Sequence, residues 1–320
     1  MQQPPLLTCG DIPIKDGTST IQYQIQETAA LAVRAAYAAG RPLLIRGEPG
    51  VGKTQLAAAV AQQWGWPMLS KTVDASSESR DLHYYFDDLA RLGEAQTLAH
   101  VTDTKAASIL DPARYLSPGP LWWAFDWKRA AQVKKQCEYR QGQQPEQAAI
   151  ANTGVVVLID EIDKAEAELP NGLLETLGQR SFRVPYHPQL IQYQPNQAAP
   201  LIIITTNEER ELPAAFLRRC WVLKLALPTE KTAFIEQLKA RGQAHFAGEI
   251  KDPELYTKAA AQLWNSRETA RRKAIPKPGQ AEYLDLLRAI STLATDAAGQ
   301  RQLYSQVADY VMDKASYDPD

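Results

Sequence analysis

Short apolar runs alternate with longer stretches of helical periodicity. The runs at 43–45, 155–159 and 201–204 contain only apolar residues, mostly β-branched residues or leucine. Such runs are typical of strands that are buried on both faces in the middle of a parallel sheet. Two further strands are predicted at 68–73 and 221–225, where polar residues interrupt the apolar ones. The helical patterns between the runs predict an α/β fold with a parallel sheet.

The pattern before the first of these strands predicts an irregular segment and then one helix. Residues 1–20 contain three prolines and two glycines, so an irregular lead-in is expected. Apolar residues at helical intervals predict a helix over residues 21–39, which Gly40 ends.

Residues 81–99 predict another helix, which contains the aromatic cluster at 84–86. Aromatic residues at helical spacing are usually buried, so packing in the core or against another subunit is the favoured interpretation. A surface that grips a client protein is the alternative. Residues 111–130 predict a structured insertion, because a turn cluster precedes an aromatic-rich helix start. Residues 140–153 predict a polar loop.

The pattern changes again in the last third of the chain. A helix over 169–178 and a hairpin or extended excursion over 179–194 precede the run at 201–204. From Thr229 onward the pattern is helical, over residues 231–240, 253–264, 279–293 and 299–312. We therefore expect a boundary near Pro228, between an α/β domain of residues 1–228 and a smaller all-α domain of residues 229–320.

The amino-acid composition narrows the classes of function that the protein could have. The chain has 320 residues, of which 45% are hydrophobic and 22% charged, and its net charge is −2; these values are ordinary for a globular protein. The near-neutral balance and the lack of a polybasic tract argue against binding to nucleic acid or to a membrane surface. No apolar run is long enough for a membrane span, and the N-terminus lacks the apolar core of a signal peptide, so a cytoplasmic protein is expected.

Cysteine and histidine usage argues against two kinds of site. The three cysteines, Cys9, Cys137 and Cys220, are odd in number and widely spaced, which excludes a disulfide framework and suits the cytoplasm. The four histidines show no metal-ligand spacing, so no zinc site is predicted.

The strongest candidate for chemistry follows the first strand. It reads Gly47-Glu48-Pro49-Gly50-Val51-Gly52-Lys53-Thr54, which fits G-x-x-x-x-G-K-[ST] between a strand and a helix. Its glycines let backbone N–H groups approach a polyphosphate, and the positive end of the following helix faces the same charge. Lys53 is expected to reach the β- and γ-phosphates, and Thr54 to bind Mg²⁺. The alternative, a glycine-rich turn with a chance lysine, is disfavoured because both flanks are correct.

Acidic residues follow the strand at 155–159. Asp160 is expected to hold Mg²⁺ through its water shell, opposite Thr54, and Glu161 to polarise the attacking water as general base. Solvated acids at a strand end are the alternative, which the phosphate-binding loop (P-loop) predicted at residues 47–54 disfavours. Asp163 is a weaker candidate for this chemistry, and the start of a helix is the alternative.

Polar residues after the later strands complete the set. The amide of Asn207 is expected to contact the γ-phosphate and orient the water; a turn cap is the alternative. Arg218 and Arg219 end a short predicted helix. In a ring, an arginine here can enter the neighbour's site as an arginine finger. A helix C-terminus favoured by basic residues is the alternative.

In this order, GEPGVGKT, VVVLIDEID, ITTNEER and AAFLRRC resemble the AAA+ ATPases. Four further stretches are similar to the MoxR-like branch of that family: RPLLIRGEPGVGKT, DLHYYFDDLARLGEAQ, GPLWWAF and KPGQAEYLDLLRAI. The resemblance covers residues 21–290. It implies a P-loop NTPase core sheet of order 5-1-4-3-2 flanked by helices, and a helical lid. It also implies a helix-2 insertion near 80–100 and a hairpin before sensor 1 near 179–200.

The same resemblance implies an activity and partners. Members typically form hexameric rings, hydrolyse ATP with Mg²⁺, and remodel or activate other proteins, many of them with a partner that carries a von Willebrand A domain. Arg219, directly before Cys220, aligns better than Arg218 with the family's finger. The family's sensor 2 arginine is expected where Gln280 stands, and Lys277 could substitute as a point charge without the forked geometry of arginine.

The leading hypothesis is therefore a MoxR-like AAA+ ATPase that remodels a partner protein. One alternative is a nucleic-acid-directed motor or loader, against which stand the near-neutral charge and the lack of an appended DNA-binding motif. Another is a slow nucleotide-gated switch, which Gln280 at the sensor 2 position keeps open.

Overall fold

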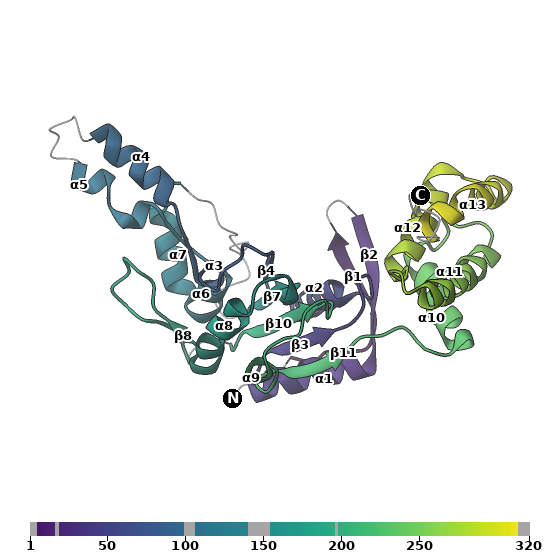
Figure 1. The fold of residues 1–320 in the computed structure, drawn as a ribbon, viewed down its shortest axis with the longest axis horizontal. Helices are drawn as coiled ribbons and strands as arrows, with labels where there is room; N and C mark the ends of the chain where they lie inside the picture. Colours follow the sequence, from purple (N-terminus) through teal and green to yellow (C-terminus); the bar gives the residue numbers. More distant parts are fainter. Residues whose placement is uncertain (1–4, 17–18, 99–105, 140–153, 196–197, 313–320) are drawn as a thin grey trace. The chain divides into compact units, whose positions relative to one another are not determined.

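The structure is a computed structural model that describes residues 5–16, 19–98, 106–139, 154–195 and 198–312 (Figure 1). The polar loop predicted at 140–153 lies outside the described residues. The chain divides into two compact units. The first comprises Met1–Thr8, Glu27–Arg46 and Ala57–Leu223, and the second comprises Cys9–Gln26, Gly47–Leu56 and Lys224–Asp320.

A five-stranded sheet forms the centre of the first unit. Its strands are β3 (Leu43–Arg46), β4 (Met68–Thr72), β7 (Val156–Asp160), β10 (Leu201–Thr206) and β11 (Trp221–Lys224), in the order β11-β3-β10-β7-β4. β10 pairs in parallel with β3 and β7, and β4 pairs in parallel with β7. All six residues of β10 are buried, as expected for a central strand with helices on both faces. The predicted order 5-1-4-3-2 is confirmed.

Helices and a small hairpin connect these strands. The helices are α1 (Glu27–Ala39), α2 (Lys53–Trp64), α8 (Glu168–Gln179) and α9 (Ala214–Leu217). After α8, strands β8 (Ser181–Phe182) and β9 (Ile191–Gln192) pair antiparallel, with Phe182 opposite Ile191. This confirms the predicted hairpin before β10.

The single helix predicted over 81–99 is wrong. The segment forms α3 (Arg80–His83), strand β5 (Tyr84–Phe86) and α4 (Asp88–Leu98), and β5 pairs antiparallel with β6 (Leu116–Pro118). Three consecutive aromatic residues favour a strand, and the carboxylate of Asp87 accepts a hydrogen bond from the backbone N–H of Ala90 at 2.9 Å. That bond starts a new helix after the strand. Tyr84 and Phe86 pack against the core, as the favoured interpretation expected.

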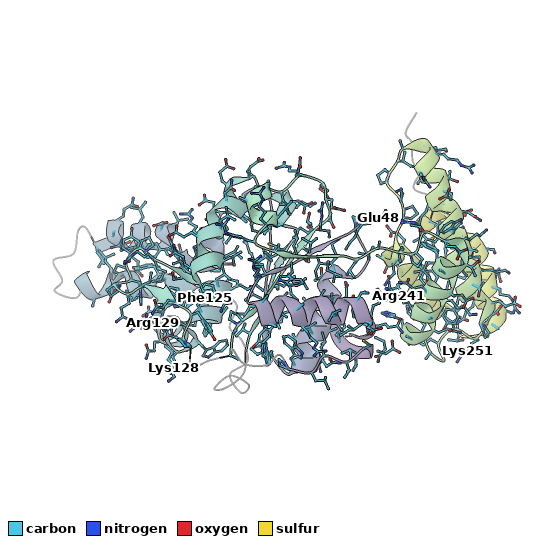
Figure 2. All side chains as sticks on the ribbon, turned by 90° about the horizontal axis from the view of Figure 1, so that it is seen from below. Glu48, Phe125, Lys128, Arg129, Arg241 and Lys251 are labelled. Carbon is cyan, nitrogen blue, oxygen red and sulfur yellow. The ribbon has the colours of Figure 1, made fainter. Side chains whose placement is uncertain are left out.

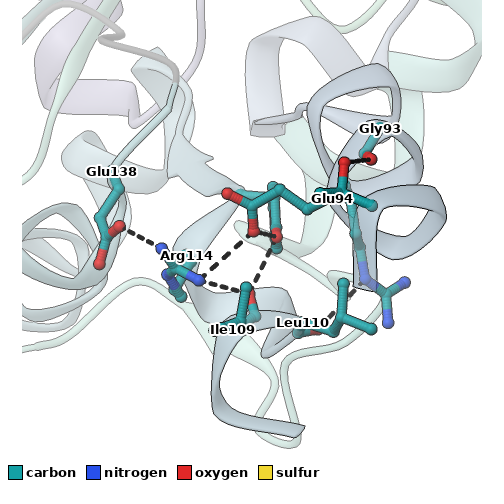
Figure 3. Close-up of polar contacts among 9 residues, drawn as sticks. Gly93, Glu94, Ile109, Leu110, Arg114 and Glu138 are labelled. Carbon is teal, nitrogen blue, oxygen red and sulfur yellow. Dashed lines mark hydrogen bonds and ion pairs between the residues drawn. The ribbon is translucent and has the colours of Figure 1, made fainter. Parts of the chain in front are cut away.

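Polar contacts attach α4 to the segment that follows it (Figure 3). The segment that follows α4 contains α5 (Ala106–Ile109) and the 3₁₀ turn η1 (Pro112–Arg114). The Arg114 guanidinium donates to the carbonyl of Ile109 at 2.6 Å and pairs with Glu138 at 2.6 Å and Glu94 at 3.5 Å. Helix α4 itself has no buried residue, so these charged contacts, rather than apolar packing, fix it.

The predicted insertion continues with α6 (Pro120–Phe125) and α7 (Trp127–Gln136). Every residue of α6 is buried, and Trp122 and Phe125 belong to the core of the first unit. On α7, Lys128 is exposed, whereas Arg129 donates to the carbonyl of Leu190 in the β8–β9 hairpin at 3.2 Å (Figure 2).

The second unit begins with an antiparallel hairpin where an irregular lead-in was predicted. Its strands are β1 (Gly10–Asp16) and β2 (Ser19–Ile25), with Ile12 opposite Tyr23 and Ile14 opposite Ile21. The predicted helix at 21–39 is therefore wrong over residues 21–26, and α1 begins at Glu27. The segment Ile-Gln-Tyr-Gln-Ile alternates apolar and polar residues, which is the period of a strand.

The rest of the second unit is helical, as predicted. Its helices are α10 (Lys231–His245), α11 (Glu254–Lys273), α12 (Gln280–Leu293) and α13 (Ala297–Met312).

None of the helices in the described part of the chain has both the length and the apolar character that a bilayer span requires. The three cysteines are free.

Candidate active site

The P-loop, residues 47–54, leaves the end of β3 and enters α2, which begins at Lys53. Gly50 and Gly52 have φ angles of 75° and 98°, in the left-handed region that glycine adopts without steric cost. A Cβ on Gly52 would lie 2.9 Å from Cε2 of Tyr23. The loop therefore keeps the conformation that turns successive backbone N–H groups toward an anion.

Lys53 lies inside this loop. Its side chain is 6% exposed, and its Nζ donates to the carbonyl oxygens of Gly47 at 2.7 Å and Glu48 at 3.0 Å. An ammonium group with carbonyl partners keeps its charge while it is buried. The positive charge is therefore held at the centre of the phosphate cradle.

Tyr23 of β2 borders the same loop and was missed by the sequence reasoning. Burial raises the pKa of Tyr23 to about 12, so its phenol stays protonated at physiological pH. The signal was the alternation of residues 21–25, which places Tyr23 on one face of a strand with Ile21 and Ile25.

In the first unit, Asp160 ends β7 beside the central strand. Its Oδ1 accepts a hydrogen bond from the Thr205 hydroxyl at 2.5 Å, and the same hydroxyl oxygen accepts from the backbone N–H of Glu161 at 2.9 Å. Thr205 is fully buried. This one hydroxyl therefore fixes both acidic residues, and its signal in the sequence was a polar residue at the end of a buried apolar run.

Glu161 has a left-handed backbone, with φ 58° and ψ 47°. A non-glycine residue in this region costs about 1–3 kcal/mol and persists only where its surroundings impose it. The side chain of Glu161 accepts a hydrogen bond from Nδ2 of Asn207 at 3.1 Å. The structure thus brings two predicted site residues together and turns the Glu161 carboxylate toward the end of β10.

Asp163 has a larger role than the helix start that the sequence predicted. It lies in the 3₁₀ turn Ile162–Lys164, is 2% exposed, and accepts from the backbone N–H groups of Asn207 at 3.3 Å and Glu209 at 2.9 Å. A buried carboxylate is tolerated when such bonds satisfy it. Asp163 therefore ties the chain after β10 to the chain after β7 and sets the position of Asn207.

Arg218 and Arg219 are both exposed. The carbonyl of Arg218 accepts from the Arg41 guanidinium at 3.4 Å, and the Arg219 guanidinium donates to the carbonyl of Ala215, one turn earlier, at 3.4 Å. The bond of the Arg219 side chain is long, so that side chain makes only a weak contact with α9.

The three charged or polar groups at the front of α12 lie in the second unit. Gln280 is the first residue of α12; it is 6% exposed, and its Oε1 has no hydrogen-bond partner among the described residues. Lys277 lies 3.7 Å from Glu48 of the P-loop. Arg267 of α11 also pairs with Glu48, at 2.6 Å, and no sequence signal pointed to it.

The oxygen donors present suit a hard cation. Thr54 supplies a hydroxyl and Asp160 a carboxylate, the ligand types that Mg²⁺ prefers together with water and phosphate oxygens. Within the described ranges, no cluster of three or more His, Cys, Asp or Glu residues could hold a metal ion.

The strand order decides which ends share an edge. β3, β10 and β7 are adjacent and parallel, so the residues that follow them leave the same edge of the sheet. In the order of the strands across the sheet these are the start of the P-loop, Asn207 and the Asp160–Glu161 pair. Residues 42–220, which contain all of them, match the family described as AAA domain (dynein-related subfamily).

This chain belongs to that family of AAA domains. The match covers more than half of the 320 residues, from the residue before β3 to Cys220. Within the AAA domain, the P-loop, the acidic pair at the end of β7 and Asn207 at the end of β10 occur in the order that the sequence analysis described. The fold is that of the AAA+ P-loop NTPases, with a helical C-terminal region.

Solved structures of RuvB from Thermotoga maritima are similar to this AAA+ chain. A point mutant is 15% identical, with a TM-score of 0.48, and the match covers 90% of this chain and 71% of RuvB. The structure described as the Holliday junction branch migration motor is 14% identical, with a TM-score of 0.44, and the match covers 89% and 70%. At these identities the likeness concerns the fold alone. No curated protein sequence matches the chain.

Proposed function

We propose that this AAA domain is a MoxR-like, Mg²⁺-dependent ATPase that works as a ring and remodels or activates a partner protein. The observation that carries the proposal is the joint geometry of Glu161 and Asn207 at the ends of neighbouring strands, 3.1 Å apart, in a chain whose P-loop precedes them. A phosphate cradle alone binds nucleotide. A carboxylate that an amide positions can also activate water.

Each residue has a distinct part in this proposal. Residues 47–54 bind the phosphates of ATP through backbone N–H groups and the Lys53 ammonium. Thr54 and Asp160 would hold Mg²⁺, which would neutralise the charge that develops on the phosphates. Thr205 keeps the Asp160 carboxylate oriented.

Glu161 acts as the general base, and Asn207 places it. The amide of Asn207 holds the carboxylate through its Nδ2. A γ-phosphate is a stronger acceptor site for an amide N–H than a half-buried carboxylate, because it carries more charge. Arrival of ATP therefore moves the amide toward the phosphate and frees Glu161 to accept a proton from water.

The ring belongs to the same proposal. The exposed Arg219 supplies positive charge to the γ-phosphate of a neighbouring subunit. Arg218 is the weaker alternative for this role. A hexamer, a client and an effector with a von Willebrand A domain come from the MoxR-like resemblance. That nucleic acid is not the substrate stays a prediction, and steeply salt-dependent binding to DNA would contradict it.

The deciding test is steady-state ATP hydrolysis by the assembled protein. Glu161→Gln is expected to lower kcat by about 10²–10³-fold, the usual contribution of a general base, with nucleotide binding retained. Lys53→Ala is expected to abolish binding. The matched control is Glu166→Gln, whose carboxylate is 70% exposed and pairs only with Arg210 at the surface.

Two outcomes would overturn the ATPase proposal. One is a wild-type rate no faster than that of Glu161→Gln, which would leave a nucleotide-gated switch. The other is full binding of ATP by Lys53→Ala. Co-purification with the Glu161→Gln variant, which is expected to retain its client in the ATP state, then identifies the partner.

A further inference from the structure

We propose that Arg267 is a positioning residue that couples phosphate binding at the P-loop to the seating of helix α12. The inference rests on the proposed function, because the ligand that it concerns is a nucleoside triphosphate. All of the contacts that carry it lie within the second compact unit.

One arm of Arg267 contacts the P-loop. Its Nη2 lies 2.6 Å from Oε2 of Glu48, the residue after the first glycine of the loop. The Arg267 side chain is 15% exposed and that of Glu48 is 47% exposed. A guanidinium–carboxylate bond of this length on a mostly buried arginine is stronger than an ordinary surface ion pair.

The other arm contacts the start of α12. Nη1 of Arg267 donates to the carbonyl oxygen of Pro278 at 2.7 Å, and Pro278 directly precedes Gly279, the N-cap of α12. Arg267 also lies over the Phe234 ring, 5.8 Å from its centroid. The planar guanidinium is therefore held in one orientation and joins the P-loop to the beginning of a helix that lies 230 residues later in the chain.

Backbone contacts lie alongside this bridge. A Cβ on Gly279 would lie 3.0 Å from the carbonyl oxygen of Pro49, and a Cβ on Gly50 would lie 2.9 Å from Cβ of Ala281. The first turn of α12 thus packs directly on residues 49 and 50. Any change in the P-loop that accompanies phosphate binding is transmitted to this turn.

The need for such a bridge follows from Gln280. This residue opens α12 and is buried with an unpartnered Oε1, but it carries no charge that would draw α12 to a phosphate. Lys277 is 40% exposed and 3.7 Å from Glu48, so it adds a weaker, solvent-screened attraction. Arg267 is the mostly buried cation of this set, and it acts through Glu48 rather than by touching the phosphates.

The test compares nucleotide binding with protection of α12 in the full-length protein. The ligand is MgATP, and the parent protein is the Glu161→Gln variant. Two quantities are measured: the dissociation constant of MgATP and the rate of backbone hydrogen exchange over residues 278–286. In the parent protein, saturating MgATP is expected to slow exchange in this segment. Arg267→Gln is expected to raise the dissociation constant about three- to tenfold and to lose the added protection even at saturation.

Two variants provide the comparison. Arg271→Gln removes a cation one turn further along α11 that is 74% exposed and pairs with Glu268 at 3.9 Å, and it is expected to behave as the parent. Glu48→Gln is expected to match Arg267→Gln, and the double variant to be no worse than either single variant. Arg267→Lys is expected to recover part of the protection, because it keeps the charge but not the two-armed geometry.

The inference is overturned if Arg267→Gln gains the same protection with MgATP as Arg271→Gln, or if the effects of Glu48→Gln and Arg267→Gln simply add. If Arg267→Gln does not fold, Glu48→Gln and Arg267→Lys decide, since Glu48 is half exposed. Failure of the proposed function has a different signature. A protein that binds ATP without hydrolysing it still gains the protection of α12, and in a protein that binds no nucleotide the non-additivity of the two substitutions can still be measured in the unfolding free energy.

Discussion

Two buried side chains next to the predicted catalytic residues hold the acidic pair and Asn207 in place. The hydroxyl of Thr205 bonds both Asp160 and the backbone of Glu161, and the carboxylate of Asp163 takes two backbone N–H groups after β10. Each is buried, so each bond forms in a low dielectric that strengthens it. The strained backbone of Glu161 is therefore held by its neighbours rather than by its own preference.

The stability of the protein is expected to depend on pH through one side chain, His83. Its ring stacks on Phe182 at 4.3 Å between centroids, and its Nε2 lies 3.0 Å from the Thr176 hydroxyl. Burial lowers the pKa of His83 to about 4. The unfolded state, with a pKa near 6.5, binds the proton more readily. The contribution of neutral His83 to stability is thus complete above about pH 6.5 and is lost as the pH falls toward 4.

The measurement is the unfolding free energy in urea at several pH values for the wild type and His83→Gln. The wild type is expected to lose up to about 3 kcal/mol more than the variant between pH 6.5 and pH 4. Carboxylates titrate in both proteins, so the difference between the two curves isolates His83. Parallel curves would show that the ring is protonated in the folded state.

At the scale of elements, α4 is a helix without a buried face. Leu89 and Leu92 are 79% and 56% exposed, and the helix is attached through Glu94 and Arg91. Leu89→Gln and Leu92→Gln are therefore expected to change the unfolding free energy by less than about 0.5 kcal/mol. The comparison is Leu82→Ala on α3, where a 1% exposed side chain is removed at an expected cost of about 2–5 kcal/mol.

Urea unfolding of the three variants checks this expectation. A loss above about 1 kcal/mol for either α4 variant would show that this face is covered, for example by another subunit. If the α4 variants keep wild-type stability and ATP hydrolysis but lose activation of a client, the client-gripping interpretation of the segment near 80–100 gains support.

The central strands were predictable from the sequence because each is an unbroken apolar run, and a run of this kind has few other places in a fold. The errors fell on short elements. β2 and β5 have seven and three residues. The alternation at 21–25 and the aromatic run at 84–86 were local strand signals, but each is short, and pairing with β1 and β6 decides both strands. Tertiary pairing overrides a weak helical pattern.

The residues of the candidate site also fall into those that the sequence predicted and those that it did not. Residues 47–54, Asp160, Glu161 and Asn207 were found because the chemistry fixes their spacing from strand ends. Arg267 was not found, because the contact with Glu48 joins residues 219 positions apart and no local pattern marks it. Asp163 was named, but its burial and its two backbone partners depend on how β7 and β10 lie side by side.

At the scale of the whole molecule, a ring would use the exposed end of α9. Arg219→Ala alone and Lys53→Ala alone are both expected to be inactive in ATP hydrolysis. Mixed in equal amounts, they can form sites in which an intact P-loop from one subunit meets an intact Arg219 from a neighbour. Random assembly gives such a combination at roughly a quarter of the sites, and activity is expected to return to about that fraction of the wild-type rate.

The control mixture is Arg219→Ala with a variant that carries both substitutions, in which no complete site can form and no activity is expected. Arg218→Ala alone is expected to keep most of the wild-type rate. Recovery in the first mixture and its absence in the second require a finger that acts between subunits, since no single chain then holds both groups. If the first mixture stays inactive while Arg218→Ala alone abolishes hydrolysis, Arg218 is the finger and the assignment to Arg219 is wrong.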